Sequence, residues 1–310
     1  MIPPAFDYAR PTSLDEALRV LADGGEDAKV LAGGQSLLPL LRLRLAFPEL
    51  VVDVGRVPGL RGVREEGDTL VIGAMTTHHE VVRDPLVRRH AGLLAAATRT
   101  VADPAVRHRG TFGGSLAHAD PAADLPAAVL AMDGELVVAG PGGRRTVPAR
   151  DFFVDYLETV LEPDELLVEV RVPKADGWGF HYEKFQRVAQ SYAIVGVAAL
   201  VRHDEGRIAE ARIGLVNMGA TPLRAAAAER ALAGCDGTPA VARAARSAAD
   251  NTQPPRDTSG SPEYRAHLAQ VLTRRAGRAG RLPGRTRCGP VWRRRGTSST
   301  TVWPWPVSSR

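Results

Sequence analysis

Cysteine is scarce in this sequence. Cys235 and Cys288 are the only two in 310 residues. Two thiols this far apart provide neither a zinc knuckle nor an iron–sulfur cluster, which is usually held by four thiolates. Cys235 follows a predicted helix and is expected to be a small buried residue rather than a redox centre. Any metal chemistry must therefore come from partner proteins, and we predict no metal site in this chain.

Long apolar runs are also missing. No stretch approaches the roughly 20 apolar residues that a membrane-spanning helix needs. The first seven residues lack the basic-then-apolar order of a secretory signal. With 44% hydrophobic residues, the chain is long enough to form substantial cores in two or three domains. We expect a globular, cytoplasmic protein without a transmembrane segment.

Acidic residues are absent from the end of the chain. Residues 276–310 hold eight arginines and no lysine or acid, so residues 1–275 carry a net charge of −3 although the whole chain carries +5. A mildly acidic body without a basic stripe argues against nucleic-acid binding. Three of the four tryptophans also lie in this segment. Two interpretations of the aberrant basic tail at 277–310 stay open: a shifted reading frame of a GC-rich gene, and a disordered tail.

The first half of the chain mixes helices and short strands. Ser13 and Glu16 form a capping-box pattern, which predicts a helix that ends at Gly24-Gly25. Apolar periodicity predicts further helices at 86–98 and 123–132, with irregular chain at 101–109 between them. Strands are expected at 28–32, 50–54, 60–65, 69–74, 134–139, 144–148 and 165–172.

A linker is predicted at 173–177, and the second half that follows it has a different order of strands and helices. Three expected strands come first, and Ala-rich helices follow them. This order of strands and then helices is typical of an α+β domain. The strands are expected at 179–187, 192–203 and 207–217, and the helices at 222–233, 239–249 and 262–275.

Two glycine-rich segments stand out, Ala32-Gly33-Gly34-Gln35-Ser36 and Thr111-Phe112-Gly113-Gly114-Ser115. Glycine lets the backbone approach an anion closely and turn several amides toward it. Either pair alone also fits an ordinary turn, but two in the same half favour one phosphate site built from two loops. Neither a Rossmann Gly-x-Gly-x-x-Gly pattern nor a Walker lysine is present.

Asp124 follows the second glycine segment at the start of a predicted helix. The simple interpretation is a helix cap. The functional interpretation is that its carboxylate accepts hydrogen bonds from the hydroxyls of a bound cofactor. His118, Asp120 and Asp124 would form a metal site only if all three side chains pointed the same way.

These segments together resemble a known family. The order AGGQSLLP at 32–39, RHRGTFGGSLAHADPAAD at 107–124 and ELL at 165–167 is similar to the medium, FAD-binding subunit of the molybdenum hydroxylases, the xanthine dehydrogenase and aerobic carbon monoxide dehydrogenase family. The carbon monoxide dehydrogenase branch is the most similar. The resemblance extends over residues 1–275, and two glycine motifs at this separation are highly specific.

The resemblance implies an α+β fold. Residues 1–175 would form an FAD-binding domain of the para-cresol methylhydroxylase type, with two α/β subdomains at about 1–55 and 56–175. Residues 176–276 would form a C-terminal α+β domain with a three-stranded antiparallel sheet and helices. Relatives would continue one more helical stretch after residue 276, where this chain changes character.

The resemblance also implies which residues bind non-covalent FAD. No residue is expected to act as a general acid or base, since the redox chemistry belongs to the cofactor. Tyr192 is a further candidate for stacking on the flavin, although an aromatic residue at the start of a strand is more often part of a core. The implied cofactor-binding residues are Lys29, Val30, Leu31, Ala32, Gly33, Gly34, Gln35, Ser36, Leu37, Val101, Ala102, Thr111, Gly113, Gly114, Ser115, Asp124, Leu161 and Lys184.

The implied function is electron transfer within a complex. A large molybdopterin-binding subunit would oxidise the substrate, a small [2Fe-2S] subunit would carry the electrons, and FAD on this chain would pass them to an external acceptor. The expected assembly is a dimer of heterotrimers. Two alternatives stay open: a stand-alone FAD-dependent oxidoreductase of the same fold, and an inactive module that only binds partners.

Overall fold

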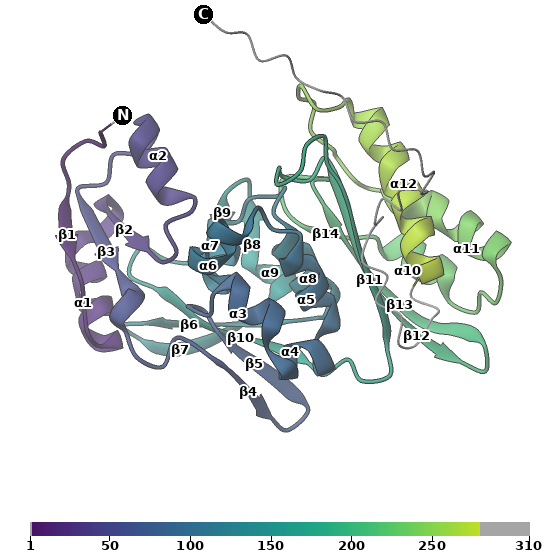
Figure 1. Cartoon of the computed structure of the whole chain (residues 1–310), viewed down its shortest axis with the longest axis horizontal. Coiled ribbons are helices and arrows are strands. Elements are labelled where there is room, and N and C mark those ends of the chain that lie inside the picture. The colour runs from purple at the N-terminus through teal and green to yellow at the C-terminus, as the bar shows by residue number, and fades with distance from the viewer. Residues whose placement is uncertain (1, 280–310) are drawn as a thin grey trace, which may run out of the picture.

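The computed structural model describes residues 2–279, which form three units in a row (Figure 1). The first unit is a three-stranded parallel sheet in the order β1-β3-β2. Ser13 accepts a hydrogen bond from the Glu16 amide and caps α1. The elements of this unit are β1 (Asp7–Ala9), α1 (Leu14–Gly24), the 3-10 helix η1 (Gly25–Asp27), β2 (Ala28–Leu31), α2 (Leu37–Leu43), β3 (Leu50–Asp53) and the 3-10 helix η2 (Val54–Arg56).

The second unit is built on an antiparallel sheet in the order β4-β5-β10-β6-β7. Its strands alternate their side chains between two faces. One face packs with Ala17 and Leu21 of α1, and the other packs under a layer of helices. The strands are β4 (Val63–Glu66), β5 (Thr69–Gly73), β6 (Glu135–Gly140), β7 (Gly143–Pro148) and β10 (Leu166–Pro173), and β8 (Phe153–Asp155) and β9 (Glu158–Thr159) form a separate hairpin.

Between residues 85 and 109, the helical layer departs from the sequence expectation in two places. The single helix expected at 86–98 is two helices that meet at Ala91, whose backbone is not helical (φ −136°, ψ 46°). The segment 101–109, expected to be irregular, contains a helix capped by Asp103 with Pro104 in its first turn. The helices of the layer are α3 (His78–Arg83), α4 (Pro85–His90), α5 (Gly92–Arg99), α6 (Pro104–Arg109), α7 (Phe112–His118), α8 (Asp124–Ala131) and α9 (Ala149–Phe152).

The third unit is an antiparallel sheet in the order β11-β12-β13-β14. A three-stranded sheet was expected, and the added strand β14 has only two residues, too few for a periodic signal. Helices α10, α11 and α12 cover one face of the sheet. The elements are β11 (Gly179–Phe185), β12 (Val195–Asp204), β13 (Arg207–Val216), β14 (Leu223–Arg224), α10 (Ala226–Leu232), α11 (Thr238–Ala244), the 3-10 helix η3 (Ala245–Ala249) and α12 (Pro262–Ala279).

The mixed helix-and-sheet fold is confirmed. Helix α12 continues to Ala279, so the first three residues of the segment expected as a tail belong to a helix. The remainder of the expected tail, residues 280–310, lies outside the described residues. No helix within residues 2–279 is long and apolar enough to cross a membrane.

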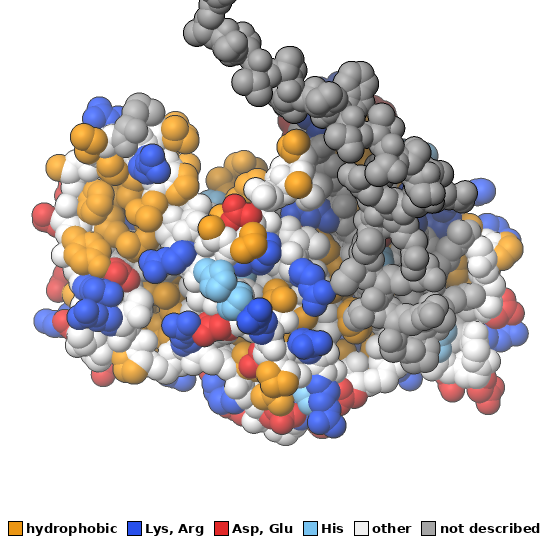
Figure 2. All heavy atoms as spheres, in the orientation of Figure 1, with side chains coloured by type: hydrophobic (Ala, Val, Ile, Leu, Met, Phe, Trp, Pro, Cys, Tyr) orange, Lys and Arg blue, Asp and Glu red, His pale blue; other side chains and the backbone are white. Residues whose placement is uncertain are grey.

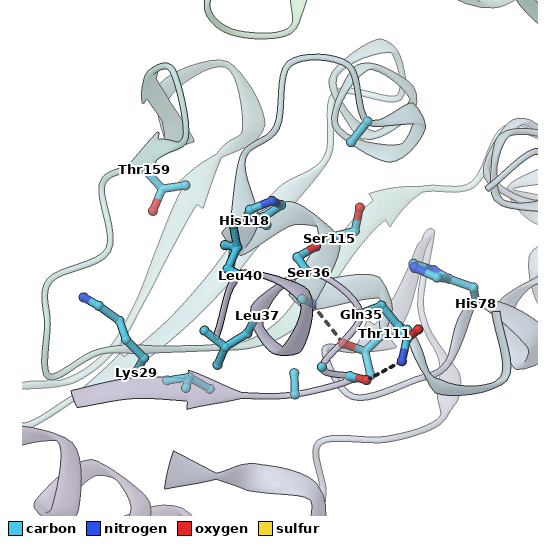
Figure 3. A pocket seen from close by; sticks show the side chains of 18 of the residues that line it. Lys29, Gln35, Ser36, Leu37, Leu40, His78, Thr111, Ser115, His118 and Thr159 are labelled. Atoms are coloured by element: carbon cyan, nitrogen blue, oxygen red, sulfur yellow. Dashed lines mark hydrogen bonds between the residues drawn. The ribbon is translucent and has the colours of Figure 1, made fainter. Parts of the chain in front are cut away.

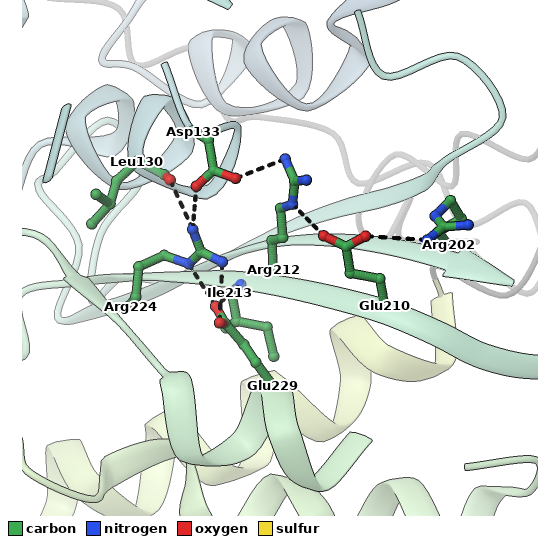
Figure 4. Close-up of polar contacts among 8 residues, drawn as sticks. All are labelled: Leu130, Asp133, Arg202, Glu210, Arg212, Ile213, Arg224 and Glu229. Atoms are coloured by element: carbon green, nitrogen blue, oxygen red, sulfur yellow. Dashed lines mark hydrogen bonds and ion pairs between the residues drawn. The ribbon is translucent and has the colours of Figure 1, made fainter. Parts of the chain in front are cut away.

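Helix α8 joins the second and third units. All eight of its residues are buried. Seven of them are apolar and Asp124 is the exception, as expected for a helix that is covered on every side. It lies so close to β13 that a Cβ on Gly214 would come within 2.1 Å of the Ala127 carbonyl oxygen. Just beyond the helix, Asp133 pairs with Arg212 at 2.9 Å and with Arg224 at 2.6 Å (Figure 4). The third unit is therefore fixed against this helix by packing and by charge.

Candidate functional site

A cavity of about 850 Å³ lies where the first unit, the helical layer and the end of β11 meet. The space-filling view shows the molecule hollowed between the first unit and the helical layer (Figure 2). Of the residues implied to bind a cofactor, all line this cavity except Leu31 and Gly113. The fold thus brings together segments that are far apart in the sequence: Lys29–Leu37, Val101-Ala102, Thr111–Ser115, Asp124, Leu161 and Lys184.

The first glycine loop offers unpaired backbone amides to the cavity. The N–H groups of residues 32–36 donate to no acceptor within residues 2–279. Gly34 has a positive φ of 72°, which L side chains rarely adopt. Gly33 permits close contact with the second loop, because a Cβ there would lie 2.4 Å from the Arg109 carbonyl oxygen. Consecutive free amides of this kind form a concave site for an anion.

The second glycine segment differs from the first in the partners of its amides. Its amides are already bonded, Gly113 to the Ala74 carbonyl at 2.8 Å and Gly114 to the Thr111 hydroxyl at 3.1 Å. A Cβ on Gly113 would clash with Ala74 at 2.4 Å. The absence of a side chain at these glycines therefore lets α7 pack closely on its neighbours. The hydroxyls of Thr111 and Ser115 are the groups that this segment presents to the cavity (Figure 3).

A buried carboxylate and ammonium lie together in the wall of the cavity. Asp124 Oδ2 is 2.8 Å from Lys184 Nζ, and each side chain is 5% exposed. The Tyr182 hydroxyl donates to the other carboxylate oxygen. Burial raises the pKa of Asp124, while the adjacent Lys184 acts in the opposite direction. Asp124 does not cap α8, whose N-cap is Ala123. A carboxylate has about four lone-pair sites, so beside these two donors it can still accept hydrogen bonds from hydroxyl groups in the cavity.

A strained backbone position borders the cavity at Ala102, where φ is +40°. Residues other than glycine seldom adopt this region, and strained backbone positions cluster at functional sites. Arg107 holds the turn by donating to the carbonyl oxygens of Val101 at 2.8 Å and Ala102 at 3.0 Å. These contacts fix the segment expected to face the flavin.

An ion pair stabilises the cavity wall near Leu161. Arg145 forms two hydrogen bonds with the Glu165 carboxylate at 2.6 and 2.8 Å and one with the Val160 carbonyl at 2.7 Å. The hydrogen bonds from Arg145 lower the pKa of Glu165. Leu161 and Glu165 both line the cavity, so this network shapes its wall.

The sequence did not single out Tyr182, which donates to the Asp124 carboxylate, or His78, which lines the cavity. Tyr182 lies two residues before Lys184 on β11, and strand alternation places both on one face, so this signal was available. His78, Gln190 and Ser191 line the cavity without such a signal, whereas Tyr192 was already a candidate for stacking on the flavin. Tyr192 lines the cavity, and its side chain is 58% exposed. The base of its loop is fixed by Asn217, which donates to the Ala193 carbonyl at 2.8 Å.

The metal site considered at His118, Asp120 and Asp124 does not form within residues 2–279, where no group of three suitable ligands occurs. Asp120 instead accepts a hydrogen bond from the Ala122 amide at 2.8 Å. This hydrogen bond closes a turn at residues 120–122, in the chain just before α8.

Comparison with known proteins gives matches over almost all of the described chain. Residues 4–175 match the family model of the FAD binding domain in molybdopterin dehydrogenase, and residues 180–279 match the CO dehydrogenase flavoprotein C-terminal domain. The carbon monoxide dehydrogenase medium chain of Hydrogenophaga pseudoflava is 44% identical over 278 residues, which cover 89% of this chain and 97% of the relative.

Two further matches extend this finding. The 6-hydroxypseudooxynicotine dehydrogenase complex subunit alpha of Paenarthrobacter nicotinovorans is 41% identical over 280 residues, 89% of this chain and 94% of the relative. A solved chain of the H. pseudoflava carbon monoxide dehydrogenase, in a form that lacks the Mo-pyranopterin moiety of the molybdenum cofactor, superposes with a TM-score of 0.88 at 46% identity. That superposition covers 90% of this chain and 98% of the other.

Proposed function

Because the chain belongs to the family of FAD-binding subunits of molybdenum hydroxylases, we propose that it holds FAD non-covalently in the cavity, as the electron-transfer component of an oxidoreductase complex. Electrons would come from the iron–sulfur clusters of a partner subunit and leave to an external acceptor. The observation that carries this proposal is the single cavity on which both glycine segments, Asp124 and Lys184 converge.

The cavity suits a dinucleotide in size and in chemistry. Its volume of about 850 Å³ lies toward the upper end of the roughly 300–1,000 Å³ common for ligand sites. The free amides of residues 32–36 suit the pyrophosphate, and the hydroxyls of Ser36, Thr111 and Ser115 can donate to it. Asp124 is placed to accept hydrogen bonds from sugar hydroxyls. FAD supplies the redox chemistry once bound, and this chain binds it and shields it from water.

The partners proposed are a large molybdopterin-binding subunit and a small [2Fe-2S] subunit, in a dimer of heterotrimers. The names of the relatives support a multi-subunit assembly, since they denote a medium chain and a complex subunit. The same names point to carbon monoxide in one case and 6-hydroxypseudooxynicotine in the other. A flavoprotein so similar in both complexes is not expected to choose the substrate, so we assign substrate choice to the molybdenum subunit.

The test compares this chain alone with the co-expressed complex. The chain alone should purify yellow with one FAD per molecule, and its flavin should stay oxidised when candidate substrates are added. With both partner subunits present, the substrate of the complex should bleach the flavin absorption. Bleaching of the chain alone would instead show a stand-alone oxidoreductase. A colourless chain that takes up no FAD would contradict the proposal and favour an inactive module.

A further inference from the structure

His78 presents an unpartnered side chain to the cavity. It is the first residue of α3, and it is only 4% exposed. Its ring lines the cavity and points toward Gln35 and Thr111 (Figure 3). Nδ1 is buried and has no hydrogen-bond partner within residues 2–279. The edge of the ring that carries Nε2 faces Gly110, where a Cβ would come within 3.1 Å of that nitrogen.

The backbone around His78 is held firmly. Thr77 and Glu80 form a capping box that fixes the start of α3. The His78 amide donates to the Gly110 carbonyl at 2.9 Å, and Thr77 and Thr111 form an antiparallel bridge. The histidine is thus tied to the second glycine segment, which itself borders the cavity. These backbone contacts between the start of α3 and residues 110–111 fix the position of the ring.

The imidazole is neutral at physiological pH. Burial first, and the positive charge of Arg107 second, lower the pKa of His78 from its usual 6.5 to about 4. A neutral imidazole has one N–H donor and one acceptor nitrogen. Buried polar groups in native proteins nearly always have partners. A neutral histidine that has no partner and whose ring borders the cavity is therefore suited to hydrogen-bond to a ligand through its imidazole.

We propose that His78 is a further FAD-binding residue, whose imidazole hydrogen-bonds to a polar group of the cofactor. This inference rests on the proposed function, because it takes FAD as the occupant of the cavity. It adds a contact from α3, an element that contributes no other residue to the cavity among those described. His78 would orient the cofactor and would take no part in the redox chemistry.

The test measures FAD affinity of the full chain after removal of its cofactor. His78→Phe keeps a ring but loses both polar atoms, and it should weaken FAD binding roughly tenfold, the effect of one hydrogen bond. His78→Asn keeps a donor and an acceptor and should recover part of this loss. His79→Phe is the matched control, because His79 is the next residue of α3, stacks on His108 and does not line the cavity. Its affinity should equal that of the wild type.

A second measurement does not depend on the stability of a variant. In wild-type protein with ¹⁵N-labelled histidine, FAD should shift the imidazole resonance that disappears in His78→Asn. Wild-type protein that binds FAD without this shift, or His78→Phe with unchanged affinity, would overturn the inference and leave the proposed function intact. Failure of the wild-type protein to bind FAD at all would overturn both.

Discussion

The variant Lys184→Met tests whether the buried ion pair is part of the cavity wall. The substitution keeps an unbranched side chain of similar length but removes the ammonium group that lies 2.8 Å from the Asp124 carboxylate. Asp124 would then remain buried without a cationic partner, although the Tyr182 hydroxyl would still donate to it. Removing one member of a buried pair typically costs about 3–5 kcal/mol, because the other charge is left uncompensated. We expect a loss of unfolding free energy of this size at neutral pH.

The loss should depend on pH in a defined direction. Burial already raises the pKa of Asp124, and Lys184 opposes that rise, so removing Lys184 raises the pKa further. A carboxyl group with a raised pKa takes up its proton more readily in the folded state than in the unfolded state, and folding is then favoured by acid. The deficit of Lys184→Met relative to the wild type should therefore be largest at alkaline pH. It should shrink as the pH falls through the raised folded-state pKa.

Chemical unfolding of the cofactor-free protein, followed by circular dichroism at several pH values, measures this effect. The double variant Asp124→Asn with Lys184→Met removes both charges, so it should be more stable than Lys184→Met and should lack this pH dependence. Three results would refute the reasoning: a single-variant loss under about 1 kcal/mol, a deficit that is the same at all pH values, or a double variant no more stable than the single one.

Three other predictions concern the loops, the join between units and the chain end. Gly33→Ala should lower the FAD content of the purified protein, because the added Cβ would come within 2.4 Å of the Arg109 carbonyl oxygen. The control Gly142→Ala should retain FAD, because a Cβ at Gly142 has nothing within 4 Å. Equal FAD content in the two variants would contradict the packing argument. Arg224→Met should cost about 1–3 kcal/mol in chemical unfolding, because Arg224 bridges Asp133 and Glu229 at 2.6 Å each. The control Arg207→Met should change stability little, because the partner of Arg207, Asp236, is exposed and lies 3.7 Å away. A similar loss of unfolding free energy in the Arg224 and Arg207 variants would argue against a special role of Arg224. Deletion of residues 280–310 should leave FAD affinity unchanged, because the cavity is lined by residues 21–192; a measured loss of affinity would show that this deleted segment contributes to binding.

Local signals in the sequence determined much of the fold. Ser13 and Glu16 predicted the start of α1, and the structure shows that cap. The order of strands and then helices after residue 175 predicted the third unit correctly, apart from the two-residue β14. The break at Ala91 was missed, although Gly92 follows it directly and a glycine inside a helical pattern lowers its helix propensity. A Cβ on Gly92 would lie 2.3 Å from the Phe180 ring, so that region is shaped by contact with β11, a segment far away in the sequence.

The sequence by itself determined which residues were candidates for the site, through two glycine motifs and the residues that follow them. Only the tertiary structure decided what each does. Gly33 and Gly34 leave amides unpaired, while the amides of Gly113 and Gly114 are already bonded. Asp124 meets Lys184 and Tyr182 because α8 packs on the third unit. The physical reason is that glycine patterns and caps are local, whereas burial, charge pairing and the partners of an amide depend on segments that only folding brings together.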